Sequence, residues 1–216
     1  MIYLIGGPPR CGKTTIAKIL AKKTKYQWVQ INHFRFIVSG YYSNQERCEK
    51  FPFSYIKKRV NWDNDIIFNK YTSKELVKYY KIQASTIWPG LRNYCKQLVK
   101  ERGNAILEGY HIQPNLIYKL LNSNPDLQEN IKVVFLYREN IDSIIWGLKK
   151  GDPKSDWILR NTRNRETLHK VAKMISEYGK YTKKEAEKYN FQIFNTERHF
   201  RWKIIKAIKY LQKVEK

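Results

Sequence analysis

The first fifteen residues, MIYLIGGPPRCGKTT, restrict the fold more than any other segment of the chain. Residues 2–5 are apolar throughout and are followed by glycine, a pattern typical of a strand buried inside a parallel sheet. Residues 7–14 then have the spacing Gly-x-x-x-x-Gly-Lys-Thr, and residues 15–23 have a helical pattern. The segment therefore predicts a strand, a glycine-rich loop and a helix, in that order.

A loop with this spacing is suited to binding phosphate. Its glycines let backbone N–H groups turn inward, and the N-terminus of the following helix adds a partial positive charge. Lys13 would reach the terminal phosphates, and the Thr14 hydroxyl would bind Mg²⁺. The alternative is a chance turn before an amphipathic helix, against which the strand-loop-helix context argues. We therefore predict a site for a nucleoside triphosphate, ATP, with Mg²⁺, formed by Gly7, Arg10, Gly12, Lys13, Thr14 and Thr15.

Along the rest of the chain, apolar runs typical of strands alternate with helical patterns. This order predicts the α/β class, with a five-stranded parallel sheet between helices on both faces in a three-layer sandwich. Pro89 and Gly90 are expected to kink or split one of the helices. Strands are expected at residues 2–5, 26–32, 105–109, 131–137 and 191–194, and helices at 15–23, 73–102, 114–121, 141–149, 156–178, after Thr182 and after Thr196.

The length of 216 residues predicts a single domain, residues 1–216. Within it, residues 34–80 are aromatic and irregular in pattern, and we expect them to form a mobile or irregular cap over the acceptor of the reaction. Residues 149–165 combine a loop signal with basic residues and are expected to form a lid. Arg160 and Arg163 would share one helical face there and stabilise a transferred phosphoryl group, although a solvated basic face is the competing interpretation.

The formal net charge of +23 raises the question of nucleic acid as a partner. Lysine is spread along almost the whole chain without a clustered basic tract, so nucleic acid stays open but is not the favoured partner. A small anionic acceptor would benefit from the same field. Three cysteines without paired spacing predict neither a disulfide framework nor a zinc site. No stretch is long and apolar enough to span a bilayer, so we expect no membrane partner and a cytoplasmic location.

Polar residues follow the predicted strands where ligands of open parallel sheets bind, at the carboxyl ends. Glu108 follows an apolar strand and would hold the magnesium shell or polarise an attacking group. Arg35 would bind an anionic substrate through its guanidinium group, whereas His111 is equally compatible with a structural role. The complete set of strand-end candidates is Asn32, His33, Arg35, Glu108, Gly109, His111, Arg138, Asn195 and Thr196.

The stretches GGPPRCGKTT, INHFR, ILEGYH and YTKKEAEKYNFQIFNTE, together with a basic segment, resemble the small P-loop kinases of the nucleoside monophosphate kinase-like group. Within that group the chain looks most similar to 2-phosphoglycerate kinase-like proteins, in which an Ile/Leu-Glu-Gly-x-His stretch follows the third strand. The resemblance implies a P-loop NTPase fold over nearly the whole chain. It implies phosphate and magnesium binding by Lys13 and Thr14, an acidic second motif at Glu108, an acceptor contact at Arg35, lid residues Arg160 and Arg163, and Asn195 and Thr196 near the adenine.

One residue departs from the group. Many of its members carry an aspartate just after the second strand as general base, whereas this chain has Asn32, which takes no proton at neutral pH. Either His33 or Glu108 has that role, or the acceptor is already ionised, or catalysis is lost. The sequence therefore predicts an ATP-dependent phosphotransferase acting on a small, anionic acceptor. Two alternatives stay open: a kinase for a nucleotide or a nucleic-acid end, and a regulatory module that binds nucleotide without catalysis.

Overall fold

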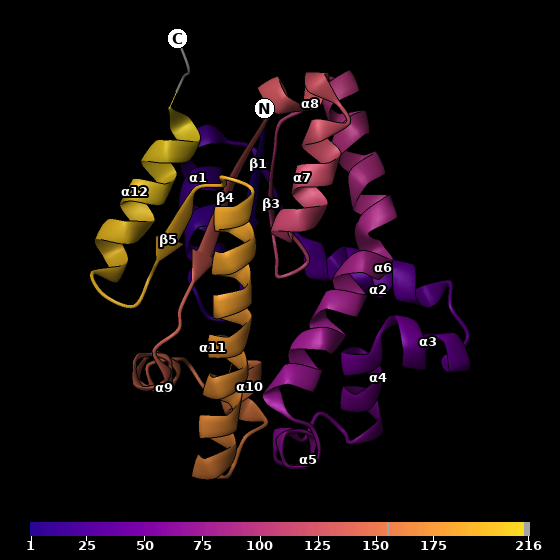
Figure 1. Ribbon diagram of the computed structural model, residues 1–216, viewed down its shortest axis with the longest axis vertical. Coiled ribbons are helices and arrows are strands. Elements are labelled where there is room, and N and C mark those ends of the chain that lie inside the picture. Colours follow the sequence, from indigo (N-terminus) through magenta and orange to yellow (C-terminus); the bar gives the residue numbers. More distant parts are fainter. Residues whose placement is uncertain (155, 214–216) are drawn as a thin grey trace.

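A computed structural model describes residues 1–154 and 156–213 of the chain (Figure 1). Its centre is a five-stranded sheet in the order β2-β3-β1-β4-β5, in which the paired strands are parallel. The predicted fold class is therefore confirmed. The strands are β1 (Ile2–Gly6), β2 (Gln27–Gln30), β3 (Ala105–Glu108), β4 (Ile131–Tyr137) and β5 (Ile193–Asn195).

Apolar side chains of the central strands point alternately to the two faces of the sheet, because successive residues of a strand face opposite ways. Leu4 belongs to one buried cluster and Ile5 to another. Helices α6 (Ser73–Lys100) and α7 (Pro114–Asn122) pack on the Leu4 side, with the short α8 (Pro125–Asn130) beside them. On the Ile5 side lie α1 (Lys13–Thr24) and α12 (Phe200–Gln212), as Figure 1 shows. Helices thus cover both faces.

The long helix α11 (Arg165–Lys188) joins the sheet to the helices below it in Figure 1. Gly179 permits this packing: a Cβ atom there would lie 2.0 Å from the carbonyl oxygen of Arg138, at the end of β4. The predicted helix over residues 156–178 is wrong in one respect, because residues 161–164 interrupt it and Asn164 caps α11. The prediction of a separate helix after Thr182 is also wrong. Thr182 lies inside α11, and its hydroxyl donates a hydrogen bond to the Tyr178 carbonyl oxygen.

Residues 34–80, the predicted cap, are mostly helical, with short connections at 41–43, 51, 60–63 and 71–72, so the expected irregular structure is wrong. The cap consists of α2 (Ile31–Gly40), α3 (Asn44–Lys50), α4 (Pro52–Arg59), α5 (Asn64–Lys70) and the start of α6. Capping side chains begin these short helices: Ser43 and Glu46 form a capping box, and Asp63 accepts bonds from two N–H groups of α5. Many of the aromatic residues that obscured the helical pattern lie between helices, for example the tilted pair Phe53 and Tyr80.

The cap packs against the predicted lid through a third buried cluster. It joins Phe53, Ile67 and Leu76 from the cap to Ile144 of α9 (Ile141–Lys149) and Ile158 of α10 (Trp157–Arg160). Ser155, inside the predicted lid, lies outside the described residues. The cap and the predicted lid therefore share one apolar core. In Figure 1 this core lies below the carboxyl ends of the strands.

Two further expectations are corrected by element boundaries. Helix α6 runs through Pro89 as one helix, so the expected split is wrong, and it is capped by Thr72, whose side chain forms a capping box with that of Glu75. Strand β2 ends at Gln30, so Asn32 lies in the first turn of α2. Within residues 1–154 and 156–213, no helix has the length and apolar character that crossing a membrane requires.

Candidate active site

The glycine-rich loop between β1 and α1 has a backbone that only glycine adopts readily. Gly7 has φ +132° and Gly12 has φ +103°, both in the left-handed region. A Cβ atom at Gly7 would lie 2.1 Å from the Leu136 carbonyl oxygen, and one at Gly12 would lie 2.8 Å from the Phe200 ring. The loop is therefore held closely between the end of β4 and α12.

Lys13 is folded onto the loop that precedes it. Its Nζ donates to the Pro8 carbonyl oxygen at 2.6 Å, and the Cys11 thiol donates to the same oxygen at 3.0 Å. The lysine is 8% exposed. A buried ammonium that has a backbone carbonyl as its close oxygen partner is a favourable site for an anion, because a phosphate oxygen carries more negative charge than a carbonyl.

Thr14 and Glu108 bring the end of β3 to the start of α1. The Thr14 hydroxyl donates to Glu108 Oε1 at 2.9 Å. A hydroxyl and a carboxylate are the hard oxygen ligands that Mg²⁺ prefers, so the pair fits the predicted metal. Within the described residues, no group of three or more His, Cys, Asp or Glu side chains could hold a metal ion. A magnesium ion here would therefore take its other ligands from phosphate and water, as Mg²⁺ usually does.

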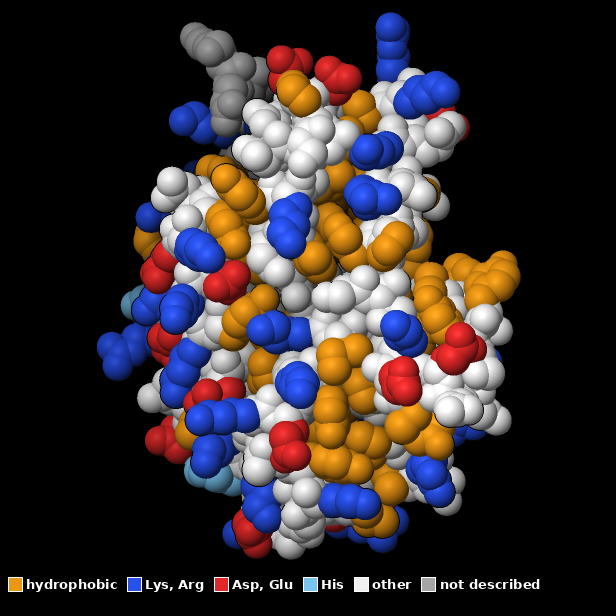
Figure 2. Space-filling model, turned by 45° about the vertical axis from the view of Figure 1, so that its right-hand side comes forward, with side chains coloured by type: hydrophobic (Ala, Val, Ile, Leu, Met, Phe, Trp, Pro, Cys, Tyr) orange, Lys and Arg blue, Asp and Glu red, His pale blue; other side chains and the backbone are white. Residues whose placement is uncertain are grey.

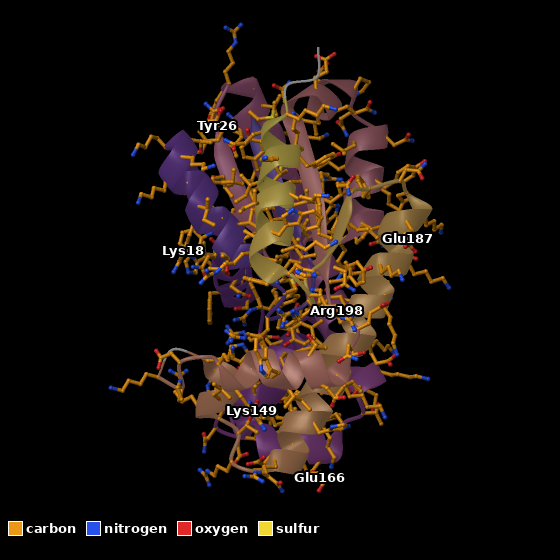
Figure 3. All side chains as sticks on the ribbon, turned by 90° about the vertical axis from the view of Figure 1, so that its left-hand side faces the viewer. Lys18, Tyr26, Lys149, Glu166, Glu187 and Arg198 are labelled. Atoms are coloured by element: carbon orange, nitrogen blue, oxygen red, sulfur yellow. The ribbon has the colours of Figure 1, made fainter. Side chains whose placement is uncertain are left out.

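A cavity of about 540 Å³ lies on the α12 side of the loop. Cationic and aromatic side chains dominate its walls, which suits a nucleotide with a charged phosphate chain and a planar base. Figure 3 shows this region, where α9 with Lys149 crosses below the loop that carries Arg198. The lining residues are Arg10, Gly12, Lys13, Thr14, Thr15, Arg138, Trp146, Gly147, Lys150, Glu197, Phe200 and Arg201.

A second cavity, of about 450 Å³, lies on the cap side of the same loop. Arg10, Lys13 and Thr14 line both cavities, so the loop stands between them. Glu108 is the one carboxylate among the described residues that line the second cavity. Its other walls are Pro9, Gln30, Asn32, His33, Arg35, Phe36, Phe53, Ser54, Lys57, Trp62, Tyr80, Gly109, Tyr110 and Trp157.

The strand-end candidates are not all at a cavity. Asn32, His33 and Arg35 line the second cavity from α2, and Arg35 Nη1 donates to Ser54 Oγ at 2.7 Å. His111 is fully buried and is not among the described residues that line this cavity. Neither of its ring nitrogens has a hydrogen-bond partner within the described part of the chain. Burial, and then the charges of Arg35 and Lys13, hold the pKa of His111 well below its usual value. The imidazole is therefore neutral at physiological pH.

Thr196 lies under the loop, away from the solvent. It is fully buried, its hydroxyl donates to the Cys11 carbonyl oxygen at 2.9 Å, and Arg138 Nε donates to that hydroxyl at 3.3 Å. The preceding Asn195 accepts a hydrogen bond from the Glu197 backbone N–H. The expectation that Thr196 begins the C-terminal helix is wrong, because α12 starts at Phe200 after His199. Its side chain instead ties the loop to β5.

Replacing Thr196 with valine tests this structural role. The isosteric change leaves a buried carbonyl and a buried guanidinium each without one partner, which is expected to lower the free energy of unfolding by about 1–3 kcal/mol. Urea denaturation followed by circular dichroism measures the change. Ser39→Ala, which removes an exposed hydroxyl, serves as the control and should alter stability by less than about 0.5 kcal/mol. Equal stability of both variants would show that the loop does not depend on the Thr196 hydroxyl.

Arg160 and Arg163 are exposed, and neither is among the described residues that line the two cavities. Arg160 ends α10 and Arg163 follows in the interrupting segment, so the two do not share a helical face. The arginines beside the phosphate loop are instead Arg10 and Arg138, which both line the first cavity. Arg10 belongs to the predicted nucleotide set, whereas Arg138 was a strand-end candidate without an assigned role.

Arg10 links the phosphate loop to Asp156, which lies in the segment predicted to be a lid. Its guanidinium lies 3.1 Å from the carboxylate of Asp156, whose side chain is 3% exposed, and Asp156 also accepts a hydrogen bond from the Ile158 N–H.

Bound phosphates would compete with Asp156 for Arg10. Asp156→Asn keeps the helix cap but removes the charge, so ATP affinity is expected to rise, by about five-fold at most for a partly exposed pair. Calorimetric titration with ATP measures it, with Asp142→Asn on α9 as control. Weaker binding in Asp156→Asn would contradict this competition.

Several residues of the two cavities have no signal in a single sequence. Trp146, Phe200 and Arg201 come from helices whose approach to the loop depends on tertiary packing. Lys57 and Trp157 meet only because the cap packs against the lid. A search limited to residues near the ends of the predicted strands would have missed all five.

Comparisons with known proteins agree with this architecture. The family model of the ATPases associated with various cellular activities (AAA) matches residues 3–68, which contain the glycine-rich loop. No curated protein matches the sequence. A candidate kinase from Chloroflexus aurantiacus has a similar structure, with a TM-score of 0.51 and 11% identity over 98% of this chain and 93% of that one. The chain has the P-loop NTPase fold.

Two further solved structures align with this chain over nearly the full length of both chains. Shikimate kinase from Bacteroides thetaiotaomicron is similar with a TM-score of 0.48 and 17% identity, over 98% of this chain and 96% of that chain. Deoxyadenosine kinase from M. mycoides, solved with bound dATP, is similar with a TM-score of 0.45 and 17% identity, over 99% and 100%. At this level of identity the likeness concerns the P-loop NTPase fold alone.

Proposed function

We propose that the chain is a P-loop kinase that transfers the γ-phosphoryl group of ATP to a small anionic acceptor. One observation carries the proposal: Arg10, Lys13 and Thr14 line two separate cavities, one on each side of the phosphate loop. A phosphotransferase needs a donor site and an acceptor site that meet at the transferred group. A module that only binds nucleotide needs the first cavity alone.

The donor side is rich in positive charge. Lys13 and the backbone N–H groups of the loop would hold the terminal phosphates, with Arg10 and Arg138 at the same cavity. Bound Mg²⁺, held by Thr14 and Glu108, would neutralise charge on the phosphates. The arginines that stabilise the transferred group are thus Arg10 and Arg138. Arg160 and Arg163 could add to them only after the lid moves, because both are exposed here.

Glu108 is the group best placed to influence the acceptor hydroxyl. Asn32 lines the acceptor cavity but takes no proton, and the buried His111 is not among the described residues of its wall. His33, the other predicted candidate for the base, lines the cavity from an exposed position on α2. Glu108 lines that cavity and at the same time accepts the hydrogen bond of Thr14. We assign it to the metal shell and to orientation of the attacking oxygen, either directly or through a metal-bound water.

A nucleotide is the second candidate acceptor, because six aromatic side chains line the acceptor cavity and favour a planar ring. A polynucleotide has less support: basic side chains spread over the face seen in Figure 2 with acidic ones among them, and form no single stripe. The resemblance of the ILEGYH stretch to 2-phosphoglycerate kinase-like proteins is the reason to include a non-nucleotide phosphate ester among the acceptors to be tested.

The test is ADP release from Mg-ATP in the presence of phosphorylated, carboxylated and nucleotide acceptors. Stimulation by at least one of them is expected, and Glu108→Gln should abolish most of it while preserving the hydrogen bond from Thr14. Glu101→Gln, at the exposed C-terminal end of α6, is the matched control. Tight ATP binding without stimulation by any acceptor would favour the regulatory module.

A further inference from the structure

Lys57 is a buried lysine whose side chain lines the acceptor cavity. It lies on α4 in the cap, and 6% of the residue is exposed. Lysines are rarely buried without a partner of opposite charge, because removing an ammonium from water is energetically unfavourable. A buried lysine at the wall of a cavity therefore requires an explanation.

Three aromatic rings surround the ammonium. Nζ lies 3.1 Å from the ring centroid of Trp157, 4.5 Å from that of Phe53 and 5.5 Å from that of Trp62. Each ring face attracts a cation, so the rings hold the ammonium in place without neutralising it. Since Trp157 belongs to α10, the lysine of the cap is held by a residue of the lid.

No negative charge balances this lysine in the described part of the chain. No ion pair or hydrogen bond from its Nζ to an acceptor is found among residues 1–154 and 156–213, and the neighbouring charge is another cation, Arg35. Burial, and then the charge of Arg35, lower the pKa of Lys57 well below its usual value. The carboxylate that does line the cavity, Glu108, is bonded to Thr14 beside the phosphate loop.

Ser54 adds a hydroxyl to the wall of the same cavity. It lies on α4 with Lys57, lines the cavity, and accepts the hydrogen bond from Arg35 Nη1. Its backbone N–H donates to the side chain of Gln83, which fixes this turn of α4 against α6. Two cations and a hydroxyl thus come together on helices that packing holds in place, and an oxyanion would satisfy all three.

We infer that Lys57, Arg35 and Ser54 form an oxyanion subsite that binds a doubly charged group of the acceptor, remote from the oxygen that is phosphorylated. Calling the bound molecule an acceptor rests on the proposed function, whereas anion binding itself does not. The subsite selects for charge: an anionic group stabilises the protonated form of Lys57 and also contacts Arg35, whereas an acceptor without such a group gains neither interaction and binds poorly. Because Trp157 contacts Lys57, the bound group also lies where cap and lid meet.

The experiment measures binding of inorganic phosphate to the full chain by calorimetry, with the phosphate loop filled by Mg²⁺ and a non-hydrolysable ATP analogue. Lys57→Met keeps the length and apolar contacts of the side chain in its aromatic surroundings. Lys58→Met removes the same charge from the adjacent, exposed position and is the control. We expect wild type and Lys58→Met to bind phosphate alike, and Lys57→Met to bind at least about ten-fold more weakly.

Equal phosphate affinity of Lys57→Met and wild type, or no binding by wild type, would overturn the inference. Acetate that binds as tightly as phosphate would overturn the requirement for a double charge. Should Lys57→Met fail to fold, ¹³C-lysine NMR of the wild type decides: the Lys57 ε-CH₂ signal, displaced by the Trp157 ring, must shift with phosphate. These readouts need no turnover, so the subsite and the phosphotransferase activity can fail independently.

Discussion

Replacing Lys13 with alanine is expected to lower acceptor-dependent ADP release by about 10²- to 10³-fold, the loss typical for one group that stabilises transition-state charge. The lysine is buried beside the loop and lines both cavities, so its ammonium is placed to contact a phosphoryl group that passes between them. Its partner in the structure, the Pro8 carbonyl, is a neutral group that a bound phosphate would replace. Steady-state kinetics with saturating acceptor measure the effect.

Folding of the Lys13→Ala variant must be checked separately, because the side chain also bonds the loop backbone. Its thermal unfolding should stay close to that of wild type, since the lost partner is a single carbonyl. Lys22→Ala, an exposed position near the other end of α1, is the matched control and should leave the rate unchanged. A Lys13→Ala variant that keeps more than about a tenth of the wild-type rate would contradict a direct role in phosphoryl transfer.

Gly7→Ala is expected to give the largest loss of stability. The residue has φ +132°, and the added methyl group would lie 2.1 Å from the Leu136 carbonyl oxygen, which belongs to β4, a strand inside the sheet. Backbone strain of about 1–2 kcal/mol and a clash of about 1–3 kcal/mol add to a loss of roughly 3 kcal/mol in the free energy of unfolding. Chemical denaturation measures it. Nucleotide binding should be lost as well, because the loop must move to relieve the clash.

Gly90→Ala is the control for this substitution. Gly90 lies inside α6, and a Cβ atom there would have no atom within 4 Å. Alanine is therefore expected to stabilise the helix, by about 0.5–1 kcal/mol. A Gly7→Ala variant as stable as Gly90→Ala would show that the loop can adopt another conformation without disturbing β4.

The sheet and the phosphate loop were predictable because their signals are local. A buried parallel strand is a short apolar run, and the spacing of Gly7, Gly12 and Lys13 is contained in eight consecutive residues. The position of Glu108 also follows, since it directly succeeds such a run and parallel strands end at one edge. Its hydrogen bond to Thr14 agrees with that expectation.

The lid and the cap were less predictable because tertiary contacts determine them. Arg160 and Arg163 have helical spacing, but the chain leaves the helix after Arg160, and Asp65 of the cap accepts a bond from the Arg163 N–H. The motif alone does not indicate that Arg10 pairs with Asp156, because folding brings Asp156 to it. The environment of Lys57 depends on Trp157, a residue far away in the sequence. A single sequence contains none of these contacts.

The most direct test of the account is the fate of the γ-phosphate. ATP labelled at that position is incubated with the protein, Mg²⁺ and the acceptor that best stimulates ADP release, and the labelled products are separated. The account predicts one phosphorylated acceptor for each ADP formed, with inorganic phosphate as a minor product. ADP accompanied by inorganic phosphate alone, or ATP bound but never consumed with any acceptor, would contradict a donor and an acceptor site on either side of the phosphate loop.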